Sequence, residues 1–200
     1  MKLIQRNRDA AYLQYDKYVD FDNPIVMEKA MDLTKNCRSV YEKIETIYYF
    51  VRDEIDHTWD AKDSTITISA SDVLEKKTGI SYSKANLLAA LLRANNFYTG
   101  FCYIRIKHKG GKMAMHALNA VYHPDLKKWI RLDARGNKYG GFNADYTHNE
   151  TQLGHVIDSA AGEYVFNDLI AVPLPSTMRV LEQSTNFLKM YFNDMPDYDA

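Results

Sequence analysis

Hydrophobic residues recur at helical spacing through the first part of this 200-residue chain. Asn23 followed by Pro24 predicts a helix start, because asparagine caps helices well and proline fits the first helical position. A second helix is expected from Ser39, because the stripe that follows it has the spacing of a core-facing helix. That stripe consists of Val40, Ile44, Ile47, Tyr48, Val51 and Ile55.

A short helix and a long apolar helix are predicted next. Ser69 and Asp72 have the spacing of a capping box, which indicates the start of the short helix. Lys77 would be its last residue, and Gly79 would end it. Residues 82–94 then form a pattern that is apolar almost all the way round a helix, and such a helix belongs in the middle of a core.

The pattern changes from helical spacing to alternation after residue 100. Three strands are predicted, at residues 101–107, 113–122 and 127–134. Gly110-Gly111 and Pro124-Asp125 are turn-forming pairs between them, so antiparallel hairpins are expected. Helices first and strands afterwards indicate an α+β fold rather than a parallel sheet with alternating helices.

The last third of the chain carries weaker signals. Residues 135–163 are rich in glycine, asparagine and histidine and are expected to form loops. Residues 164–172 fit either a strand or a short helix, and residues 178–192 have a helical pattern.

The charge balance excludes one class of partner. Lysine and arginine number 25 against 26 aspartate and glutamate, and this net charge of -1 offers no basic footprint for nucleic acid. The basic residues are spread along the chain and no apolar run could span a bilayer, so no membrane partner is expected. The first residues lack the apolar stretch of a secretory signal, which favours a cytoplasmic protein.

Cysteine and histidine usage points away from disulfides and metals. Cys37 and Cys102 are too few for a disulfide framework, and we expect both to be small buried hydrophobic residues. The six histidines form neither a His-Glu-x-x-His motif nor a zinc-ligand spacing with cysteine. We therefore expect neither a metal nor another cofactor.

Candidate chemistry lies in the second predicted hairpin. A turn centred between Pro124 and Asp125 would place His116 directly opposite Asp133. An aspartate beside a histidine fixes the tautomer of the ring and stabilises its protonated form. A register shift of one residue would instead put the two side chains on opposite faces. The same pattern is explained equally well if His116 is an ordinary strand residue and Asp133 only ends its strand by starting a turn.

Ser81 opens the long apolar helix and is the other candidate. A helix N-terminus carries partial positive charge and free N–H groups, which lower the pKa of a cysteine there and stabilise an oxyanion. Serine suits the position less well, because a base must remove its proton fully. If the helix packs on the sheet, its N-terminus lies over the pair of His116 and Asp133. Helix capping alone would also explain a serine at this position.

Four segments around these residues follow one another in a recognisable order. They are IYYFVRDEIDHTWD from residue 47, ASDVLEKKTGISYSKANLLAALLRANNF from residue 70, MHALNAVY with His116, and WIRLDARGN with Asp133. At these spacings the chain resembles the transglutaminase-like superfamily, in its bacterial branch of candidate cysteine peptidases. The resemblance covers about residues 10–175.

The resemblance implies a papain-like α+β fold, in which a helix that carries the nucleophile packs on an antiparallel sheet. It also implies a Cys-His-Asp triad for acyl transfer at an amide, with His116 as general base and Asp133 as its orienting partner. The nucleophile position falls on Ser81, where the family has cysteine, and Ser83 is a weaker candidate. We expect one domain over residues 1–200. Its parts are N-terminal helices at about 10–40, a core at about 40–140 and an extension at 141–200.

Three explanations of Ser81 stay open. The chain is an engineered Cys-to-Ser variant, a natural relative that lost its thiol, or a true serine acyltransferase. We favour the first slightly, because the rest of the motif is complete, and we expect the chain as it stands to be inactive or weakly active. Hydrolysis of a peptide, protein or small amide is the expected activity of a thiol parent, ahead of transamidation. The alternative is a non-catalytic binding module for a peptide or protein partner.

Overall fold

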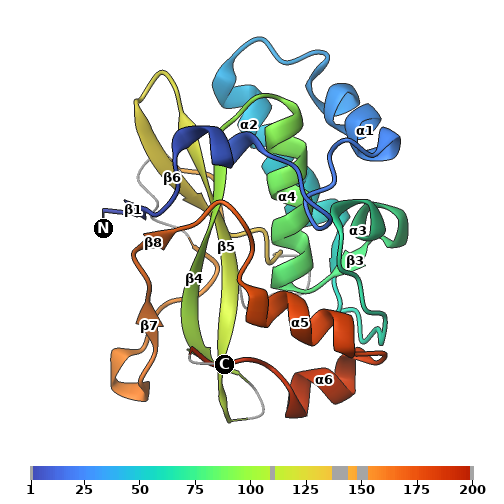
Figure 1. Cartoon of the computed structure of the whole chain (residues 1–200), viewed down its shortest axis with the longest axis vertical. Coiled ribbons are helices and arrows are strands. Elements are labelled where there is room, and N and C mark those ends of the chain that lie inside the picture. The colour runs from blue at the N-terminus through green and yellow to red at the C-terminus, as the bar shows by residue number, and fades with distance from the viewer. Residues whose placement is uncertain (1, 109–110, 137–143, 148–152, 199–200) are drawn as a thin grey trace.

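The structure, a computed structural model, describes residues 2–108, 111–136, 144–147 and 153–198 (Figure 1). The α-helices are α1 Pro24–Thr34, α2 Val40–Tyr49, α3 Ala70–Lys76, α4 Ser81–Ala94, α5 Pro175–Gln183 and α6 Phe187–Asn193. Shorter helical segments are η1 Asp9–Leu13, the π-helical η2 Phe50–Glu54, and η3 Ser159–Ala161. The strands are β1 Ile4–Gln5, β2 Asp56–His57, β3 Thr78–Gly79, β4 Thr99–Lys107, β5 Met113–His123, β6 Lys128–Leu132, β7 Tyr164–Val165 and β8 Asp168–Leu169.

A four-stranded antiparallel sheet in the order β6-β5-β4-β7 forms one layer, and the α-helices gather on one side of it (Figure 1). β4 pairs along its whole length with Met113–Val121 of β5. β6 pairs with only one end of β5, and its last pair is Leu132 with Asn119. Within the described residues, the rest of that edge of β5 has no strand beside it. The predicted α+β architecture is therefore confirmed, and the sheet contains one partly open edge.

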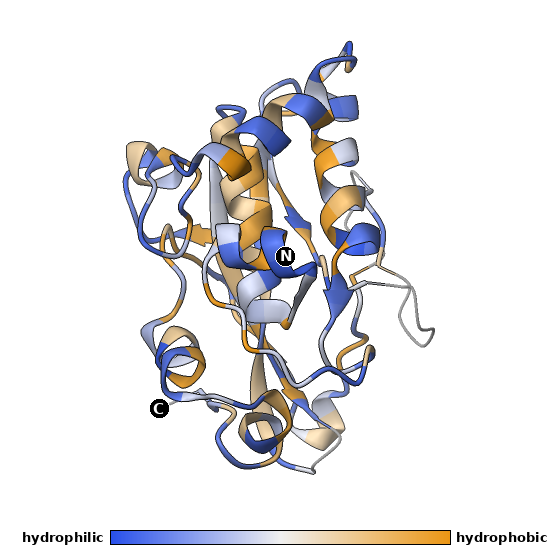
Figure 2. Cartoon of the chain, turned by 90° about the vertical axis from the view of Figure 1, so that its right-hand side faces the viewer, coloured by the Kyte–Doolittle hydropathy of each residue, from blue (hydrophilic) through white to orange (hydrophobic). Residues whose placement is uncertain are grey.

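The centre of the hydrophobic core is α4. Its residues from Ser81 to Arg93 are all buried, because α1, α2 and α3 pack on it from one side and β4 and β5 from the other. Figure 2 shows apolar residues along the inner helix and hydrophilic residues in the outer connections. This confirms the prediction of a helix that is apolar nearly all round. In the described part of the chain, no helix combines the length and the apolar character needed to cross a membrane.

The opposite face of the sheet is covered by η1 and the stretch around β8. Tyr12 is completely buried there, and its ring lies 5.1 Å from that of Trp129. Cys102 belongs to the same cluster and is buried as expected. Cys37 is only half-buried, contrary to expectation, because it lies in the connection that follows α1.

The predicted caps at Asn23 and Ser69 are confirmed, and Ser39, where a helix was expected to begin, is also a cap. The side chains of Asn23, Ser39 and Ser69 each accept a hydrogen bond from a backbone N–H in the first turn of α1, α2 and α3. The predicted end of α3 is wrong. Lys77 ends this helix in the left-handed conformation, with φ of 56°, and Gly79 lies in β3, which pairs with β2. The pairing of β3 needs an extended backbone at Gly79, so the turn falls two residues earlier.

The last part of the chain differs from its prediction in two places. The helix expected over residues 178–192 is two helices, because Ser184 adopts an extended conformation after α5 and Asn186 caps α6. Residues 164–172 contain two short strands, β7 and β8. Of the loop expected over residues 135–163, the described residues include the short helix η3, and residues 137–143 and 148–152 lie outside them. Gly110 of the first predicted turn also lies outside the described residues.

Arg93 connects three separate parts of the chain near the end of α4. Its guanidinium donates hydrogen bonds to the backbone carbonyls of Gln14, Thr99 and Ala171, at 2.5 to 3.1 Å. Only 3% of Arg93 is exposed, so these carbonyls have little access to water. The side chain therefore holds the N-terminal segment and the segment after β8 against the core.

Replacement of Arg93 by methionine should lower the free energy of unfolding by about 3 kcal/mol, because buried carbonyls lose charged donors. Urea denaturation measures this change. Arg8→Met is the matched control, since Arg8 is exposed, and its effect should stay within about 0.5 kcal/mol. An equal effect of the two substitutions would contradict the role of Arg93.

Candidate active site

The second hairpin has the predicted strands but a different turn. His123 is the last paired residue of β5, so residues 124–127 form the connection and the centre of the turn lies one residue later than predicted. Lys127, the last residue of this connection, adopts a positive φ of 50°. The register therefore differs by two residues, and the predicted direct opposition of His116 and Asp133 is wrong. A difference of two keeps both side chains on one face, because side chains alternate along a strand.

His116 and Asp133 meet as diagonal neighbours. Nε2 of His116 lies 3.1 Å from both carboxylate oxygens of Asp133. The two residues are 6% and 2% exposed, so the pair is shielded from water. β6 ends one residue before Asp133, which leaves the aspartate outside the ladder and able to turn toward the ring. The expectation that these side chains come within hydrogen-bond distance is confirmed.

Further donors hold the carboxylate of Asp133. The backbone N–H groups of Arg135 and Gly154 donate to it at 3.0 and 3.1 Å. Burial alone would raise the pKa of Asp133, but the charge of His116 and these hydrogen bonds outweigh burial and hold that pKa below its ordinary value. An ionised Asp133 bonded to Nε2 leaves Nδ1 of His116 as the nitrogen that can exchange a proton with a reacting group.

The backbone around Asp133 is fixed from two sides. The hydroxyl of Tyr48, on α2, donates to the carbonyl of Asp133 at 3.0 Å. Gly154 approaches so closely that a Cβ there would lie 2.8 Å from an Asp133 carboxylate oxygen. Any larger residue at position 154 would displace the carboxylate or the loop. Gly154 is therefore a positioning residue for Asp133, and no local pattern in the sequence marks it.

Ser81 is the first residue of α4 and not its cap. Ile80 occupies the cap position and makes no side-chain cap hydrogen bond. The hydroxyl of Ser81 instead accepts a hydrogen bond from the backbone N–H of Ala117, with 3.4 Å between the oxygen and the nitrogen. The capping interpretation of Ser81 is therefore wrong, because its side chain faces β5 and not the turn of its own helix.

The start of α4 reaches the His116 pair from the edge of the strand. Met115 and Ala117 belong to the core packed against α4, and His116 alternates with them, so its side chain leaves β5 on the other face. The Ala117 N–H points along the sheet to the place where β6 has ended, and Ser81 occupies that place. The helix packs on the sheet as expected, and Ser81 and His116 line one cavity.

The turn before Ser81 depends on a close approach at Gly79. A Cβ at this position would lie 2.7 Å from the Ser83 hydroxyl. Ser83 is completely buried, and its hydroxyl lies 2.9 Å from that of Thr67. Ser83, the weaker nucleophile candidate, does not line the cavity beside Ser81. Its contacts instead fix the start of α4.

Lys84 fastens α4 to the segment after α2. It is completely buried, and its ammonium nitrogen donates to the carbonyls of Ile55 at 2.5 Å and Arg52 at 3.5 Å. Burial and the charge of Arg135 lower the pKa of Lys84 to about 7. Lys84 thus sets the position of the helix on which Ser81 is mounted.

A cavity of about 150 Å³ opens beside Ser81 and His116. Its walls include Trp59, Ile106, Met115, Tyr191 and Met195, and its polar lining includes His57 and Arg135. Burial and the charges of neighbouring Arg135, Lys84 and His116 hold the pKa of His57 well below its ordinary value, so His57 is neutral. In the described residues, no group of three or more His, Cys, Asp and Glu side chains is placed to hold a metal ion.

The wall residues were not found by sequence reasoning. His57 and Trp59 lie in the DHTWD stretch that closes a family-like segment, so a signal existed for them. Tyr191 and Met195 are distant in sequence from every predicted site residue, and no local pattern marks them. Long-range folding alone brings these two side chains to the cavity.

A buried His–Asp pair on an antiparallel sheet, with the start of a buried helix at the edge of the same strand, defines a papain-like α+β protein. Residues 28–134 match the model of the transglutaminase-like superfamily. The chain belongs to that superfamily. A comparison with curated proteins finds no match.

Three solved structures are similar to this chain, and the first of them shares its fold. A candidate cysteine protease from Cytophaga hutchinsonii matches with a TM-score of 0.53 and 20% identity, over 64% of this chain and 42% of its own. The periplasmic domain of TgpA from Pseudomonas aeruginosa gives a TM-score of 0.47 and 14% identity, over 64% and 48%. A candidate protease from Parabacteroides distasonis gives 0.42 and 16%, over 61% and 26%. The chain thus spans less than half the length of each of these structures.

Replacement of Asp133 by asparagine should reduce the acid sensitivity of the fold. The native pKa of Asp133 lies below its value in the unfolded chain, so its stabilising contribution is complete above about pH 4 and is lost as pH falls through the native pKa. The variant should be less stable by about 2 kcal/mol at pH 7. This deficit should shrink as pH falls below about 4, because protonation of Asp133 in the unfolded chain removes the advantage of the charged native carboxylate.

Urea denaturation at several pH values measures this difference. Asp125→Asn is the control, because Asp125 is exposed in the hairpin connection. A deficit for Asp133→Asn that stays constant from pH 7 to pH 2 would show that the charge of Asp133 is unimportant to the native state.

Proposed function

We propose that this chain carries the scaffold of a cysteine peptidase or amidase, with Ser81 at the nucleophile position and His116 and Asp133 as its partners. The observation that supports this most directly is the Nε2 bond of buried His116 to an ionised Asp133, beside the helix start that holds Ser81. Membership of the transglutaminase-like superfamily agrees with acyl transfer at an amide.

The geometry supports a sequence of steps for a thiol at position 81. A thiolate there attacks the amide carbonyl, and the backbone N–H at position 81, which has no partner within its own helix because it lies in the first turn of α4, can stabilise the oxyanion. His116 gives its Nδ1 proton to the leaving amine, which departs as the C–N bond breaks and a thioester remains. His116 then takes a proton from water, whose oxygen attacks the thioester and releases the acid and the thiol.

Asp133 supports these steps without exchanging a proton. Its carboxylate accepts from Nε2 of His116 and so fixes the tautomer with Nδ1 toward the reacting groups. The two backbone donors at Arg135 and Gly154 keep the carboxylate ionised and oriented. The ion pair formed when His116 is protonated therefore needs no rearrangement of the site.

Serine at position 81 makes the chain as it stands inactive or weakly active. A hydroxyl must be deprotonated by neutral His116 as it attacks, whereas a thiol at a helix start ionises beforehand. In the described contacts, the Ser81 hydroxyl is bonded to the Ala117 N–H and has no hydrogen bond with the His116 ring. An N–H that donates to this oxygen also lowers its basicity and its nucleophilicity.

A binding module is the second candidate function. The hydrogen bond between Ser81 and the Ala117 N–H favours a binding module, because it holds the Ser81 hydroxyl away from proton transfer. The cavity with its aromatic wall is nevertheless present and could hold a ligand group. Such a module would recognise a peptide or protein partner without cleaving it. For the catalytic candidate, hydrolysis is our first proposal and transamidation the second.

Replacement of Ser81 by cysteine should create a fast-reacting thiol. At pH 6, iodoacetamide should label position 81 at least about tenfold faster than it labels glutathione, because a helix start and His116 stabilise the thiolate. His116→Ala in the same background should bring the rate down to that of glutathione. Mass spectrometry of digested protein separates position 81 from Cys37 and Cys102.

The unchanged chain is the control, because it reports labelling at its two native cysteines. His123→Ala is a matched histidine control on the same strand, outside the cavity lining. Labelling of position 81 no faster than glutathione, and insensitive to His116→Ala, would leave the binding module as the better proposal.

A further inference from the structure

One segment that is distant in sequence lies across the candidate site. Residues 187–198, here the covering segment, contain α6 and the stretch that follows it. Figure 1 shows this stretch running from α6 across β5 and β4. Tyr191 and Met195 of the covering segment line the cavity that also contains Ser81 and His116. The segment is therefore part of the site rather than a remote appendage.

The covering segment occupies a hydrogen-bonding position on the open edge of β5. The Ala117 N–H points to Ser81, and the Met115 N–H, one pleat further along, donates to the carbonyl of Pro196 at 2.9 Å. An extended peptide that joins a sheet edge as an added strand uses such N–H groups. A peptide strand next to Ser81 and the covering segment therefore compete for the same backbone donor.

The first half of the covering segment is fixed by apolar contacts. Phe187 and Met190 are buried in the main core. The ring of Tyr191 stacks on that of Trp59, with 4.2 Å between their centroids and 24° between their planes. Because Trp59 belongs to the cavity wall, this stack closes the cavity on the side of α6.

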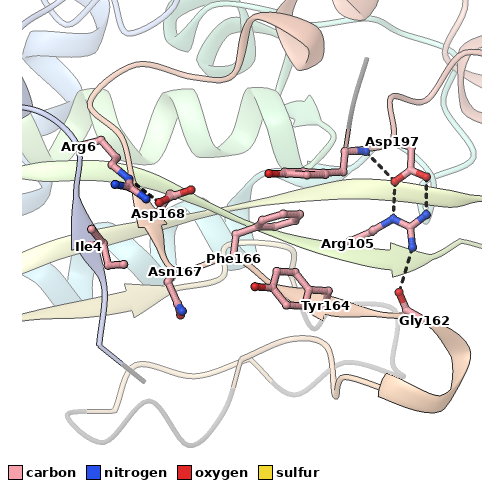
Figure 3. A pocket seen from close by; sticks show the side chains of 10 residues that line it. Ile4, Arg6, Arg105, Gly162, Tyr164, Phe166, Asn167, Asp168 and Asp197 are labelled. Carbon is pink, nitrogen blue, oxygen red and sulfur yellow. Dashed lines mark hydrogen bonds and ion pairs between the residues drawn. The ribbon is translucent and has the colours of Figure 1, made fainter.

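The second half is fixed by an ion pair and a second stack. Asp197 accepts two hydrogen bonds of 2.6 Å from Arg105 of β4, as Figure 3 shows. The ring of Tyr198 stacks on that of Phe166 at 4.5 Å. The residues of both contacts line a surface hollow that is separate from the cavity beside Ser81. The segment is thus held at both ends, with Pro196 between them over the edge of β5.

The space that remains is small. A cavity of about 150 Å³ is the size that holds one benzene-like group, and sites for larger ligands measure about 300–1,000 Å³. Ser81 is 7% exposed and His116 is 6% exposed, so neither is open to a bulky reagent. The apolar walls of Trp59, Met115 and Tyr191 favour an apolar group in this space.

We propose that the covering segment limits the site to small amides and chain ends that place one apolar side chain in the cavity. A polypeptide that continues along β5 past position 81 would be excluded while Pro196 holds the Met115 N–H. The substrate class in this inference rests on the proposed function. The exclusion of a continuing polypeptide rests only on the contacts of the covering segment.

Two reagents with one reactive group test the exclusion. In the Ser81→Cys protein, labelling is measured with iodoacetamide and with the same iodoacetyl group on the side chain of a central residue of a hexapeptide, each relative to glutathione. The central attachment makes the peptide continue on both sides of the reactive group, as an excluded polypeptide would. The ratio of the two rates cancels the intrinsic reactivity of the thiol. The peptide reagent should lag by at least about tenfold, because it needs the segment to open first.

The substitution Asp197→Asn should partly restore access of the peptide reagent to position 81. Loss of its ion pair with Arg105 should raise the open population about fivefold, and the peptide rate should rise by that factor while the iodoacetamide rate stays constant. Asp194→Asn is the matched control, since it removes the same charge from the same segment at an exposed residue. Exchange of the Met115 amide hydrogen, followed by NMR, should accelerate by the same factor in Asp197→Asn alone.

Each outcome decides the inference. A peptide rate that does not rise in Asp197→Asn overturns it, whether or not the Met115 amide exchanges faster. An equal rise for both reagents also overturns it, because it shows general loosening rather than a segment that selects by size. A slow thiol at position 81 in every variant counts against the proposed function only, since the ratio of the two reagents still reports access.

Discussion

Strand β6 ends at Leu132, so the backbone N–H groups further along that edge of β5 must find partners outside the sheet. A buried N–H without a partner costs about 1–3 kcal/mol. The Ser81 hydroxyl accepts from Ala117, and the Pro196 carbonyl accepts from Met115. The start of α4 and the covering segment are thereby drawn to one strand edge, and both meet there beside His116.

The same early end of β6 releases Asp133 from the ladder. Outside the ladder, its carboxylate can collect His116 Nε2 and the N–H groups of Arg135 and Gly154. An ionised carboxylate tolerates burial only when it is bonded in this way. The strand edge and the carboxylate together explain why a helix start, a strand residue and a strand-end residue form one site.

Much of this arrangement could be predicted from local signals. The caps at Asn23, Ser39 and Ser69 depend on neighbouring residues, and sequence patterns report such contacts well. His116 and Asp133 were paired from a turn placed one residue too early. The two side chains still meet, because the register differs from the predicted one by two residues and such a shift leaves each side chain on the same face of the sheet. The positive φ of Lys127 could not be predicted, since lysine has no preference for this conformation.

What could not be predicted depends on contacts between distant segments. Gly154 reaches Asp133 across 21 positions, and Tyr191 reaches Trp59 from the far end of the chain. No periodicity in the sequence encodes these approaches. The role of Ser81 was also misjudged locally, because the cap position belongs to Ile80 and the hydroxyl bonds to β5.

The central claim is that position 81 is built for a thiolate partnered by His116. The most direct measurement is the titration of the Ser81→Cys thiol by the ultraviolet absorbance of its thiolate, after subtraction of the unchanged chain. We expect a thiol pKa below about 6.5, and a rise toward the ordinary value of about 8.5 in the His116→Ala background. A pKa near 8.5 in both backgrounds would contradict it.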